Sequence, residues 1–383
     1  MDGAAAPRLR PRRRLHIEGF ARLTCDRTHV RFVAGDASPA FIHSDPSHQR
    51  CAFPQPTRDA DVPRALVTGG AGFIGSHVAD LYLENGYDVT VLDNFASGRR
   101  ENLPARATLV ELDLTTADAA QVVRDGRFDV ISHLGAQIDV RKSVANPMFD
   151  AGINIVGTLN LLEAVRASGR PTRFIFSSTG GALYGDFVTP PNIEEYPKDP
   201  ESPYGIAKLS AELYLAYYAR VHRVDTVALR YANVYGPRQD PHGEAGVVAI
   251  FCNRILTKQP LTVFGDGQQT RDYVFVKDVA RANLAAATRE LPAPARLDAR
   301  GFNIGTGVET TVVELAETLQ RSAGSDVPLH FAPARPGEQQ RSAVSIAKAS
   351  RELGWKPMIE LRDGLEETFA FFAARFGREQ QLT

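Results

Sequence analysis

Tyr204 and Lys208 stand four residues apart in the stretch 201–215, just after a Ser-Pro pair. Residues at i and i+4 lie on the same face of a helix, so the phenol and the ammonium can meet at one site. A nearby cation favours phenolate and lowers a tyrosine pKa from its ordinary value of ~10 towards neutral pH. The spacing therefore predicts a tyrosine general base with a lysine partner. Because the pattern is short, a surface pair that has this spacing by coincidence is the alternative.

The residues before Tyr204 are typical of a helix start. The Ser202 hydroxyl can accept a hydrogen bond from an N–H of the first turn. Pro203 suits the first helical position, where its missing N–H loses nothing. We therefore predict a helix that begins at Pro203. Its apolar stripe consists of Ile206, Leu209, Leu213 and Tyr217.

Other strands and helices must hold Tyr204 and Lys208 in place. The sequence pattern that predicts them begins at Arg64. Short apolar runs alternate from there with helical stretches, which is typical of a parallel sheet with helices on both faces. After Tyr235 glycine and proline are frequent and the alternation stops. We therefore predict an α/β fold, a doubly wound parallel sheet with a smaller C-terminal domain. The predicted strands are 64–70, 87–93, 107–114, 128–136, 172–179 and 224–236, and the predicted helices are 72–86, 154–169 and the one at Pro203.

Composition limits the class of protein. The 383 residues are 43% hydrophobic and 23% charged, with a net charge of −1, so nothing global indicates a nucleic acid or an anionic membrane as partner. No apolar run approaches the ~18 residues of a membrane span. Cys25, Cys51 and Cys252 form neither a disulfide framework nor a metal-ligand spacing. We expect a cytoplasmic protein without a metal site.

Residues 1–63 differ from the rest of the chain. They contain the basic run RLRPRRR and a stretch rich in Pro, Ser and Asp, without the apolar core of a secretory signal. We predict a disordered extension that takes no part in the fold. A basic arm that binds nucleic acid is the alternative. A further hypothesis is that the natural start lies near Val62.

A glycine-rich loop follows the first predicted strand. Gly69, Gly72 and Gly75 form the pattern G-x-x-G-x-x-G before the first predicted helix. Such glycines allow a tight turn and a close approach of the backbone to a pyrophosphate. The helix N-terminus adds free N–H groups and the positive end of its dipole. This context predicts a dinucleotide site.

Asp93 indicates which dinucleotide binds, because it ends the second predicted strand. A carboxylate there accepts hydrogen bonds from the adenosine ribose and repels a 2′-phosphate, which favours NAD. Arg99 and Arg100 keep NADP as the alternative, since a cation could accept that phosphate.

With both motifs in place, the chain resembles the extended short-chain dehydrogenase/reductase superfamily, and within it the UDP-glucose 4-epimerase branch of nucleotide-sugar epimerases. The resemblance runs from about residue 64 to about residue 376. It implies a Rossmann-type NAD-binding domain (64–234 with about 271–290) and a nucleotide-sugar-binding domain (235–270 with about 291–376). The shared motifs include VTGGAGFIGSH, VLDNFASG, HLGAQIDV, INIVGTLNLLEA, FIFSSTGGALYG, SPYGIAK, LRYANVYGPRQ, FGDGQQTRDYVFVKDVA, FNIGTG and ARPGE.

The resemblance also implies catalytic and cofactor-binding residues. Tyr204 is the base, and Lys208 binds the nicotinamide ribose and lowers the Tyr204 pKa. Thr179 is the hydroxyl between Tyr204 and the sugar 4-hydroxyl, with Ser178 as second choice because a Gly-Gly insertion before Tyr184 blurs the register. The implied cofactor-binding set is Gly69, Gly72, Phe73, Ile74, Gly75, Asp93, Asn94, Asp113, Leu114, Asn154, Tyr204 and Lys208.

The resemblance also implies that four residues bind the substrate in addition to Thr179. Asn233 contacts the diphosphate, and Arg271 and Arg335 clamp it with guanidinium groups. Glu338 meets the uridine ribose.

Several of these residues have a purely structural alternative. Asn154 could crosslink loops, Arg271 could pair with Asp272, and Glu338 could be a solvated charge. His133 ends an apolar strand and is interpreted as a structural histidine rather than a ligand.

Together these residues predict NAD-dependent epimerisation at C4 of a UDP-sugar through a transient 4-keto intermediate, with UDP-glucose and UDP-galactose as the first pair. UDP-N-acetylglucosamine and UDP-glucuronate are alternative substrates. A dehydratase is disfavoured because Gly180 and Gly181 replace the Asp-Glu pair expected after Thr179, and a decarboxylase because its Glu is missing. A non-enzymatic NAD(H)-binding regulator is the alternative from another class, although the catalytic set is whole.

The resemblance finally implies a homodimer that pairs residues 146–167 and the Tyr204 helix with a second copy. The aromatic run on that helix is Tyr214, Tyr217 and Tyr218. A separate expectation concerns Ser342, four residues past Glu338, where a small side chain leaves room for a 2-acetamido group. We therefore expect some activity on UDP-N-acetylglucosamine beside the plain hexoses.

Overall fold

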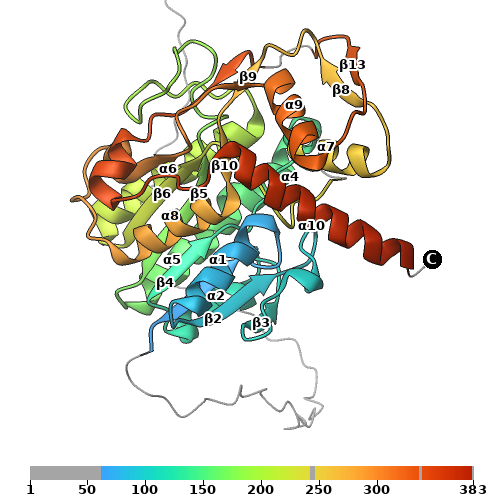
Figure 1. The fold of residues 1–383 in the computed structure, drawn as a ribbon. Coiled ribbons are helices and arrows are strands. Elements are labelled where there is room, and N and C mark those ends of the chain that lie inside the picture. The colour runs from blue at the N-terminus through green and yellow to red at the C-terminus, as the bar shows by residue number, and fades with distance from the viewer. Residues whose placement is uncertain (1–61, 242–245, 336–338, 382–383) are drawn as a thin grey trace, which may run out of the picture. The chain divides into compact units, whose positions relative to one another are not determined.

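Seven parallel strands form the largest sheet of the computed structural model, which describes residues 62–241, 246–335 and 339–381 (Figure 1). Their order is β11-β6-β5-β4-β1-β2-β3. The first six strands thus have the order of doubly wound nucleotide-binding sheets, which confirms the predicted fold class. The bounds are β1 Arg64–Thr68, β2 Asp88–Asp93, β3 Thr108–Glu111, β4 Val130–His133, β5 Arg173–Thr179, β6 Asp225–Tyr231 and β11 Gly301–Ile304.

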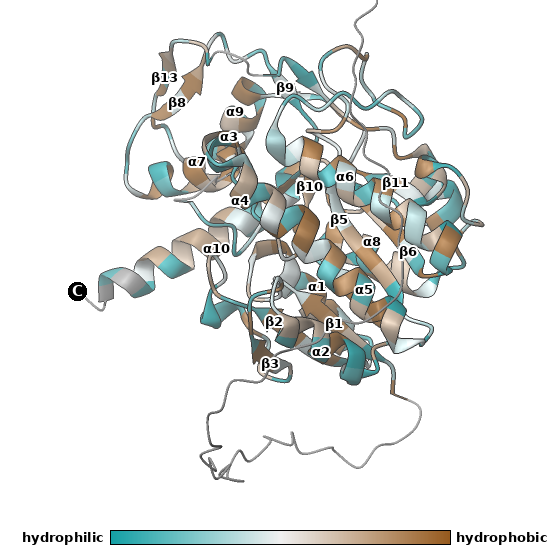
Figure 2. Ribbon diagram, turned by 180° about the vertical axis from the view of Figure 1, so that it is seen from behind, coloured by the Kyte–Doolittle hydropathy of each residue, from teal (hydrophilic) through white to brown (hydrophobic). Residues whose placement is uncertain are grey.

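Helices cover both faces of this sheet. Side chains alternate along a strand, so Val67 and Val91 share a core with α1 (Phe73–Glu84) and α8 (Val276–Thr288). Leu66 instead packs in the core of the opposite face. The helices on that face are α2 (Ala117–Gly126), α5 (Thr158–Ser168) and α6 (Pro203–Tyr217). Figure 2 shows the strands coloured mostly as hydrophobic, as expected for strands buried on both faces.

The start of α6 confirms the predicted cap. The Ser202 hydroxyl accepts a hydrogen bond from Gly205 N at 3.1 Å, and Pro203 is the first helical residue. Of the predicted apolar stripe, however, only Leu209 packs against a hydrophobic core. Ile206 is 52% exposed and Leu213 is 53% exposed, whereas Lys208 is buried.

The helix predicted over 154–169 is part of a longer helical segment. It comprises α4 (Pro147–Ala151), a π-helical turn η2 (Gly152–Gly157) and α5, and Gly169 in the left-handed conformation ends it. By length and composition this is the one segment of the described residues that could cross a membrane, and 44% of its most apolar window is buried inside the protein.

A third hydrophobic core lies in the C-terminal part of the chain, where Phe251, Leu315 and Leu365 pack together. All three residues lie in the segments predicted for the smaller domain. Its helices are α7 (Val247–Leu256), α9 (Val312–Ala323) and α10 (Leu361–Gln381), and its strands are β8 (Leu261–Phe264), β9 (Thr270–Arg271), β12 (Thr310–Thr311), β13 (Leu329–Ala332) and β14 (Arg341–Ser342).

Two expectations about elements are wrong, and one helix is not predicted from the sequence. The predicted strand 224–236 is two strands, because β7 (Asn233–Tyr235) leaves the central sheet to pair with β10 (Tyr273–Phe275). The helix α2 was not predicted. The strand β11 was assigned to the sugar-binding domain, but it pairs with β6 at the edge of the central sheet.

The remaining short elements are α3 (Val140–Ala145), η1 (Arg100–Asn102), η3 (Tyr218–His222), η4 (Leu297–Arg300) and η5 (Ala349–Leu353). The prediction for residues 1–63 falls outside the described residues except for Val62 and Pro63.

Candidate active site

A cleft with a volume of about 410 Å³ opens at the carboxyl ends of the strands. Sheets of this order bind ligands at that edge, next to the point where the strand order reverses. The structure thus brings most of the predicted site residues together. Those that line the cleft are Gly69, Gly72, Phe73, Ile74, Gly75, Asp93, Asn94, Asp113, Leu114, Ser178, Thr179, Tyr204, Lys208 and Asn233.

The glycine loop is too tight for side chains. A Cβ atom on Gly75 would lie 2.2 Å from the Gly69 carbonyl oxygen, and one on Gly69 would lie 2.7 Å from Gly135 N. Gly69 also has a positive φ of 67°. Gly72 precedes α1 and supplies no side-chain cap, so the first-turn N–H groups remain available at the cleft. This is the donor set that a pyrophosphate requires.

The Asp93 carboxylate is fixed at the end of β2. Its Oδ2 accepts from Ala71 N at 2.9 Å, and its Oδ1 accepts from Phe95 N at 2.8 Å. These bonds orient the carboxylate while each oxygen keeps a second lone pair for a ligand. Further along the cleft, Asn94 Nδ2 donates to Asp113 Oδ2 at 2.9 Å, so these two predicted residues are linked.

The two arginines that kept NADP as an alternative are engaged in other contacts. Arg99 pairs with Asp240 at 3.2 Å. Arg100 pairs with Glu111 at 2.5 Å, and its guanidinium lies 4.3 Å from the centroid of the Phe95 ring. A site with Asp93 at its wall and both arginines engaged elsewhere fits NAD.

Tyr204 and Lys208 both face the cleft from α6. The Lys208 Nζ lies 5.7 Å from the centroid of the Tyr204 ring and donates to the Ser177 carbonyl at 2.9 Å. The ammonium also lies 4.7 Å from the centroid of the Phe176 ring. The pair is therefore no coincidental surface pair.

The pKa shifts of this pair differ from the expectation. Burial raises the pKa of the Tyr204 phenol above its ordinary value, and the Asp150 carboxylate raises it further. Burial lowers the pKa of the Lys208 ammonium to about 8, against the opposing effects of Asp150 and Glu212. The net shift of the Tyr204 pKa in the protein alone is therefore upward, because loss of hydration destabilises phenolate. That Lys208 lowers this pKa stays a prediction.

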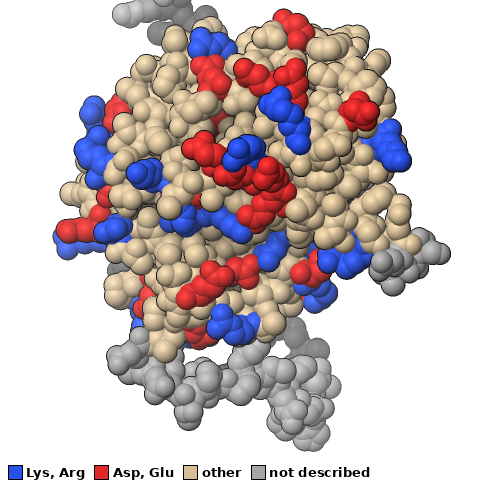
Figure 3. Space-filling view, viewed as in Figure 1, with Lys and Arg blue, Asp and Glu red and all other residues tan. Residues whose placement is uncertain are grey.

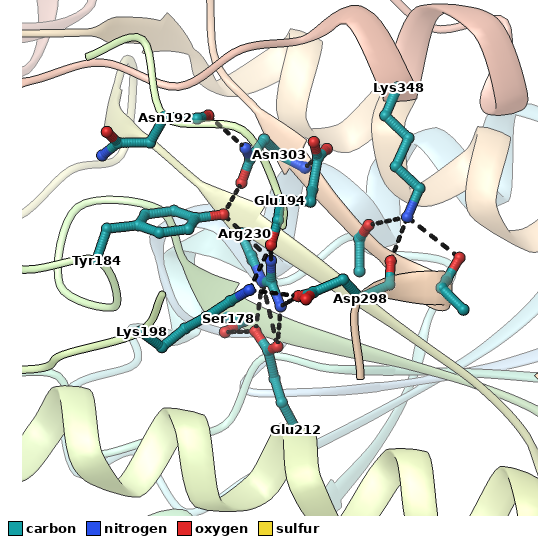
Figure 4. Close-up of polar contacts among 12 residues, drawn as sticks. Ser178, Tyr184, Asn192, Glu194, Lys198, Glu212, Arg230, Asp298, Asn303 and Lys348 are labelled. Carbon is teal, nitrogen blue, oxygen red and sulfur yellow. Dashed lines mark hydrogen bonds and ion pairs between the residues drawn. The ribbon is translucent and has the colours of Figure 1, made fainter. Parts of the chain in front are cut away.

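Thr179 and Ser178 end β5 with different partners. The Ser178 hydroxyl is buried and donates to Glu212 Oε1 at 2.6 Å (Figure 4). Thr179 Oγ1 accepts from Ala182 N at 3.1 Å, which leaves its proton for another partner. Of the two, Thr179 has the hydroxyl that can donate into the cleft.

Asn154 lies behind the wall of the cleft. Its side chain is 2% exposed, accepts from Gln137 N at 3.0 Å and donates to Gln137 O at 2.9 Å. It therefore crosslinks the loop after β4, whose residues Ala136 and Ile138 line the cleft.

Asn233 and Ser342 share a small space with Thr179. A Cβ atom on Gly181 would lie 3.9 Å from Asn233 Oδ1, 3.9 Å from Ser342 Oγ and 4.0 Å from Thr179 Oγ1. Ser342 is 3% exposed, so it does not face solvent.

The predicted cations lie outside the described cleft. Arg271, in β9, donates from Nη1 to the Thr270 carbonyl at 2.7 Å. The Arg335 guanidinium lies 3.7 Å from the centroid of the Phe264 ring. Asp272, the suggested partner of Arg271, accepts hydrogen bonds from Thr306, Gly307 and Val344. Glu338 lies outside the described residues.

His133 is a structural residue, as interpreted from the sequence. Its Nδ1 lies 2.7 Å from Thr68 Oγ1 and its Nε2 lies 3.0 Å from Thr158 Oγ1. The described residues contain no group of three His, Cys, Asp or Glu that could hold a metal ion.

Some residues that line the cleft were missed. Ser177, Gly135 and Tyr231 lie at the ends of β5, β4 and β6, and Gln239 and Tyr273 come from later segments. The rule that ligands bind at carboxyl ends of parallel strands could have identified the first three. No sequence signal marks the other two.

Comparison with known proteins places this geometry in a family. A family model described as GDP-mannose 4,6 dehydratase matches residues 66–368. A UDP-glucose 4-epimerase of Mycolicibacterium smegmatis is 43% identical over 314 residues, which cover 81% of this chain and 98% of the relative.

Two solved structures are similar over most of the chain. The UDP-glucose 4-epimerase of Thermotoga maritima, solved with UDP-glucose, is 46% identical, with a TM-score of 0.78 over 82% of this chain and 99% of that chain. The UDP-glucose 4-epimerase of Thermus thermophilus, solved with NAD, is 42% identical, with a TM-score of 0.74 over 81% and 98%. The chain therefore belongs to the extended short-chain dehydrogenase/reductase superfamily, in its UDP-glucose 4-epimerase-like branch of nucleotide-sugar epimerases.

Proposed function

We propose that this protein is an NAD-dependent UDP-sugar 4-epimerase that interconverts UDP-glucose and UDP-galactose. The observation that carries the proposal is that Thr179, Tyr204 and Lys208 line the same cleft as the glycine loop and Asp93. One dinucleotide and one sugar can therefore meet at a tyrosine base.

The described residues fit NAD. The loop from Gly69 to Gly75 and the N-terminus of α1 suit the pyrophosphate, and Asp93 suits the adenosine ribose. Lys208 is the residue proposed for the nicotinamide ribose. When bound, NAD accepts a hydride from the sugar and returns it.

The protein's own part of the reaction is to move a proton and to hold the sugar. Tyr204 takes the proton of the sugar 4-hydroxyl and later gives it back, which is general base and then general acid catalysis. Thr179 donates a hydrogen bond that fixes the reacting oxygen. The 4-keto sugar turns in the site between the two transfers, so the product carries the opposite configuration at C4.

For the nucleotide we propose the residues expected from the sequence. Asn233 contacts the diphosphate, and Arg271 and Arg335 bind it as cations, since guanidinium groups match phosphate oxygens. Glu338 is proposed for the uridine ribose.

Other activities of the superfamily fit less well. Gly180 and Gly181 carry no acid for a dehydratase, although the matching family model is named after one. The same stretch lacks the Glu of a decarboxylase. A regulator that only binds NAD(H) could use Lys208 for the nicotinamide ribose but has no use for the Thr179 hydroxyl and the Tyr204 phenol in the same cleft.

We further propose a cytoplasmic homodimer without nucleic acid or membrane as partner. Several large apolar side chains on α4, η2 and α6 are exposed, which supports a second copy as their cover. They are Met148, Phe149, Val156, Ile206, Leu213, Tyr214 and Tyr217. On the face shown in Figure 3, Lys and Arg side chains are intermixed with Asp and Glu, which is unlike the basic stripe of a nucleic-acid site.

The assay for the function follows UDP-glucose and UDP-galactose in both directions with NAD present. We expect interconversion by the wild type, and a loss of turnover by ~10² or more in Tyr204→Phe with NAD binding retained, because the general base is removed. If no UDP-hexose, N-acetylhexosamine or uronate form interconverts, the proposal is wrong. Full turnover by Tyr204→Phe would reject Tyr204 as the base.

A further inference from the structure

Asp150 is a buried carboxylate that the chemistry above does not use. It lies in α4, which packs against α6, and it is 1% exposed. Its Oδ1 accepts from Gln137 Nε2 at 2.9 Å and from Asn154 Nδ2 at 3.0 Å. Its Oδ2 is also buried, yet it has no hydrogen-bond partner among the described residues.

This arrangement leaves the Asp150 carboxylate without an ion pair among the described residues. The two donors to Oδ1 are neutral amides, which orient the carboxylate without cancelling its charge. A buried charge without a partner destabilises a fold, so its presence needs a reason.

The charge of Asp150 acts on the two residues at the base of the cleft. It raises the pKa of Tyr204 and opposes the lowering of the Lys208 pKa by burial. Both effects have the sign expected of a nearby anion, which disfavours phenolate and favours ammonium.

The other charged or titratable groups around Tyr204 and Lys208 are either paired or neutral. Glu212, one turn after Lys208 on α6, also favours the ammonium, but both its oxygens are held by Arg230. His133 on β4 is neutral, because burial lowers its pKa to about 3. Tyr231 on β6 is neutral, because burial raises its pKa.

The remaining elements that pack on α4 contribute little charge at the pair. The exposed Lys142 and Arg141 lie on α3, and Arg141 pairs with Asp139 at 3.9 Å. The π-helical turn η2 has no titratable side chain. Asp150 is therefore the carboxylate that acts on both Tyr204 and Lys208.

We propose that Asp150 is a positioning residue that balances the cations around Tyr204, so that its oxygen can both take and return a proton. The inference rests on the proposed function. An epimerase needs the phenol first as a base and then as an acid. The Lys208 ammonium favours phenolate, as the positive ring of NAD⁺ would when bound, and the Asp150 carboxylate offsets that bias.

The substitution Asp150→Asn tests the proposal with little change of shape. The new carbonyl oxygen can take the place of Oδ1 and keep both hydrogen bonds, and the new amide takes the place of the unpartnered Oδ2. The charge is lost, and the amide brings two N–H donors to the position of Oδ2. We expect both limbs of the pH profile of kcat/KM to move to lower pH by about one unit, because the pKa values of Tyr204 and Lys208 both fall.

Two control variants distinguish the effect of the lost charge from the effect of a structural change. Asp150→Glu keeps the charge and should restore the wild-type profile. Asp139→Asn removes a carboxylate from the same region, where Asn can still cap α3, and should leave the profile unchanged.

A second measurement needs no substrate. The Cζ carbon of ¹³C-labelled tyrosine reports ionisation in NMR, and Tyr204→Phe assigns the signal. We expect the Tyr204 signal of Asp150→Asn to begin titrating at lower pH than in the wild type. If the Tyr204 NMR signal shifts in Asp150→Asn but the pH profile of kcat/KM does not, Asp150 does act on Tyr204. In that case the proposed role of Tyr204 as the base is wrong.

Two outcomes overturn the proposal. One is an unchanged Tyr204 titration in Asp150→Asn. The other is that neither Asp150→Asn nor Asp150→Ser folds, as judged by circular dichroism and NAD binding, because the carboxylate would then be required for folding.

Discussion

At the scale of single residues, two adjacent hydroxyls at the end of β5 have different tasks. Ser178 donates to the buried Glu212, whereas Thr179 keeps its proton for a ligand. The structure therefore favours Thr179 as the hydroxyl that fixes the sugar.

Ser342 carries a prediction about substrate choice. It lies beside the space shared by Thr179 and Asn233, so a Tyr side chain there should narrow the site for a 2-acetamido group. We expect Ser342→Tyr to lower kcat/KM for UDP-N-acetylglucosamine about 10-fold or more relative to UDP-glucose, since differences in pocket fit of this kind are worth about 1–3 kcal/mol. Steady-state kinetics on both substrates check this.

Ser342→Ala is the matched control, because it keeps the site open and should preserve the ratio of the two kcat/KM values. An unchanged ratio in Ser342→Tyr, in a variant that melts at the temperature of the wild type, would leave this position without a role in selectivity.

The site residues that could be predicted from the sequence are those that belong to a short local motif. The glycine loop, Asp93 and the Tyr204–Lys208 pair follow from local spacing, and all of them line the cleft. The choice between Ser178 and Thr179 could not be predicted from local spacing, because it depends on Glu212, 34 residues further along the chain. The direction of the Tyr204 pKa shift was missed because it reflects burial and Asp150, which spacing does not report.

At the scale of elements, the apolar stripe of α6 shows where sequence periodicity stops being informative. A stripe with helical spacing predicts one apolar face but does not say what covers it. The inner face of α6 instead carries Lys208, Ala211 and Glu212, which are buried. The exposed stripe is thus available to another chain.

This stripe leads to a prediction about assembly. We expect the wild type to have twice the mass of one chain in light scattering at micromolar concentration. The double substitution Ile206→Glu with Leu213→Glu should give monomers, because it places unpaired charges in an apolar interface. A wild type that is monomeric at this concentration would contradict the proposed homodimer.

Val308 and Met358 provide a control for that experiment. They are 60% and 69% exposed but lie outside α4, η2 and α6. Val308→Glu and Met358→Glu should leave the dimer intact.

At the scale of the whole set of described residues, a buried polar network joins the central sheet to segments before and after β6 (Figure 4). Arg230 on β6 is fully buried and pairs with Glu212 on α6 at 2.6 Å and with Asp298 on η4 at 2.7 Å. Its guanidinium also donates to Tyr184 Oη at 3.1 Å. Three other parts of the chain therefore depend on the Arg230 side chain.

We expect Arg230→Met to lower the free energy of unfolding by about 3–5 kcal/mol, because removing one member leaves a buried carboxylate without its cation. Chemical denaturation followed by circular dichroism measures this. The comparison is Arg362→Met, whose pair with Asp363 is exposed, so this substitution should leave the free energy of unfolding nearly unchanged. Equal stabilities of Arg230→Met and the wild type would show that the network does not hold these segments.

The late position of β11 in the chain has a consequence for synthesis on the ribosome. Six strands of the central sheet are complete by Tyr231, but β11, which covers the open edge of β6, ends only at Ile304. While the intervening residues are being translated, the backbone N–H and C=O groups along that edge have no partner strand. An open edge of this kind is a template for pairing with another chain, so the interval between these two points is when the nascent protein is most exposed to aggregation.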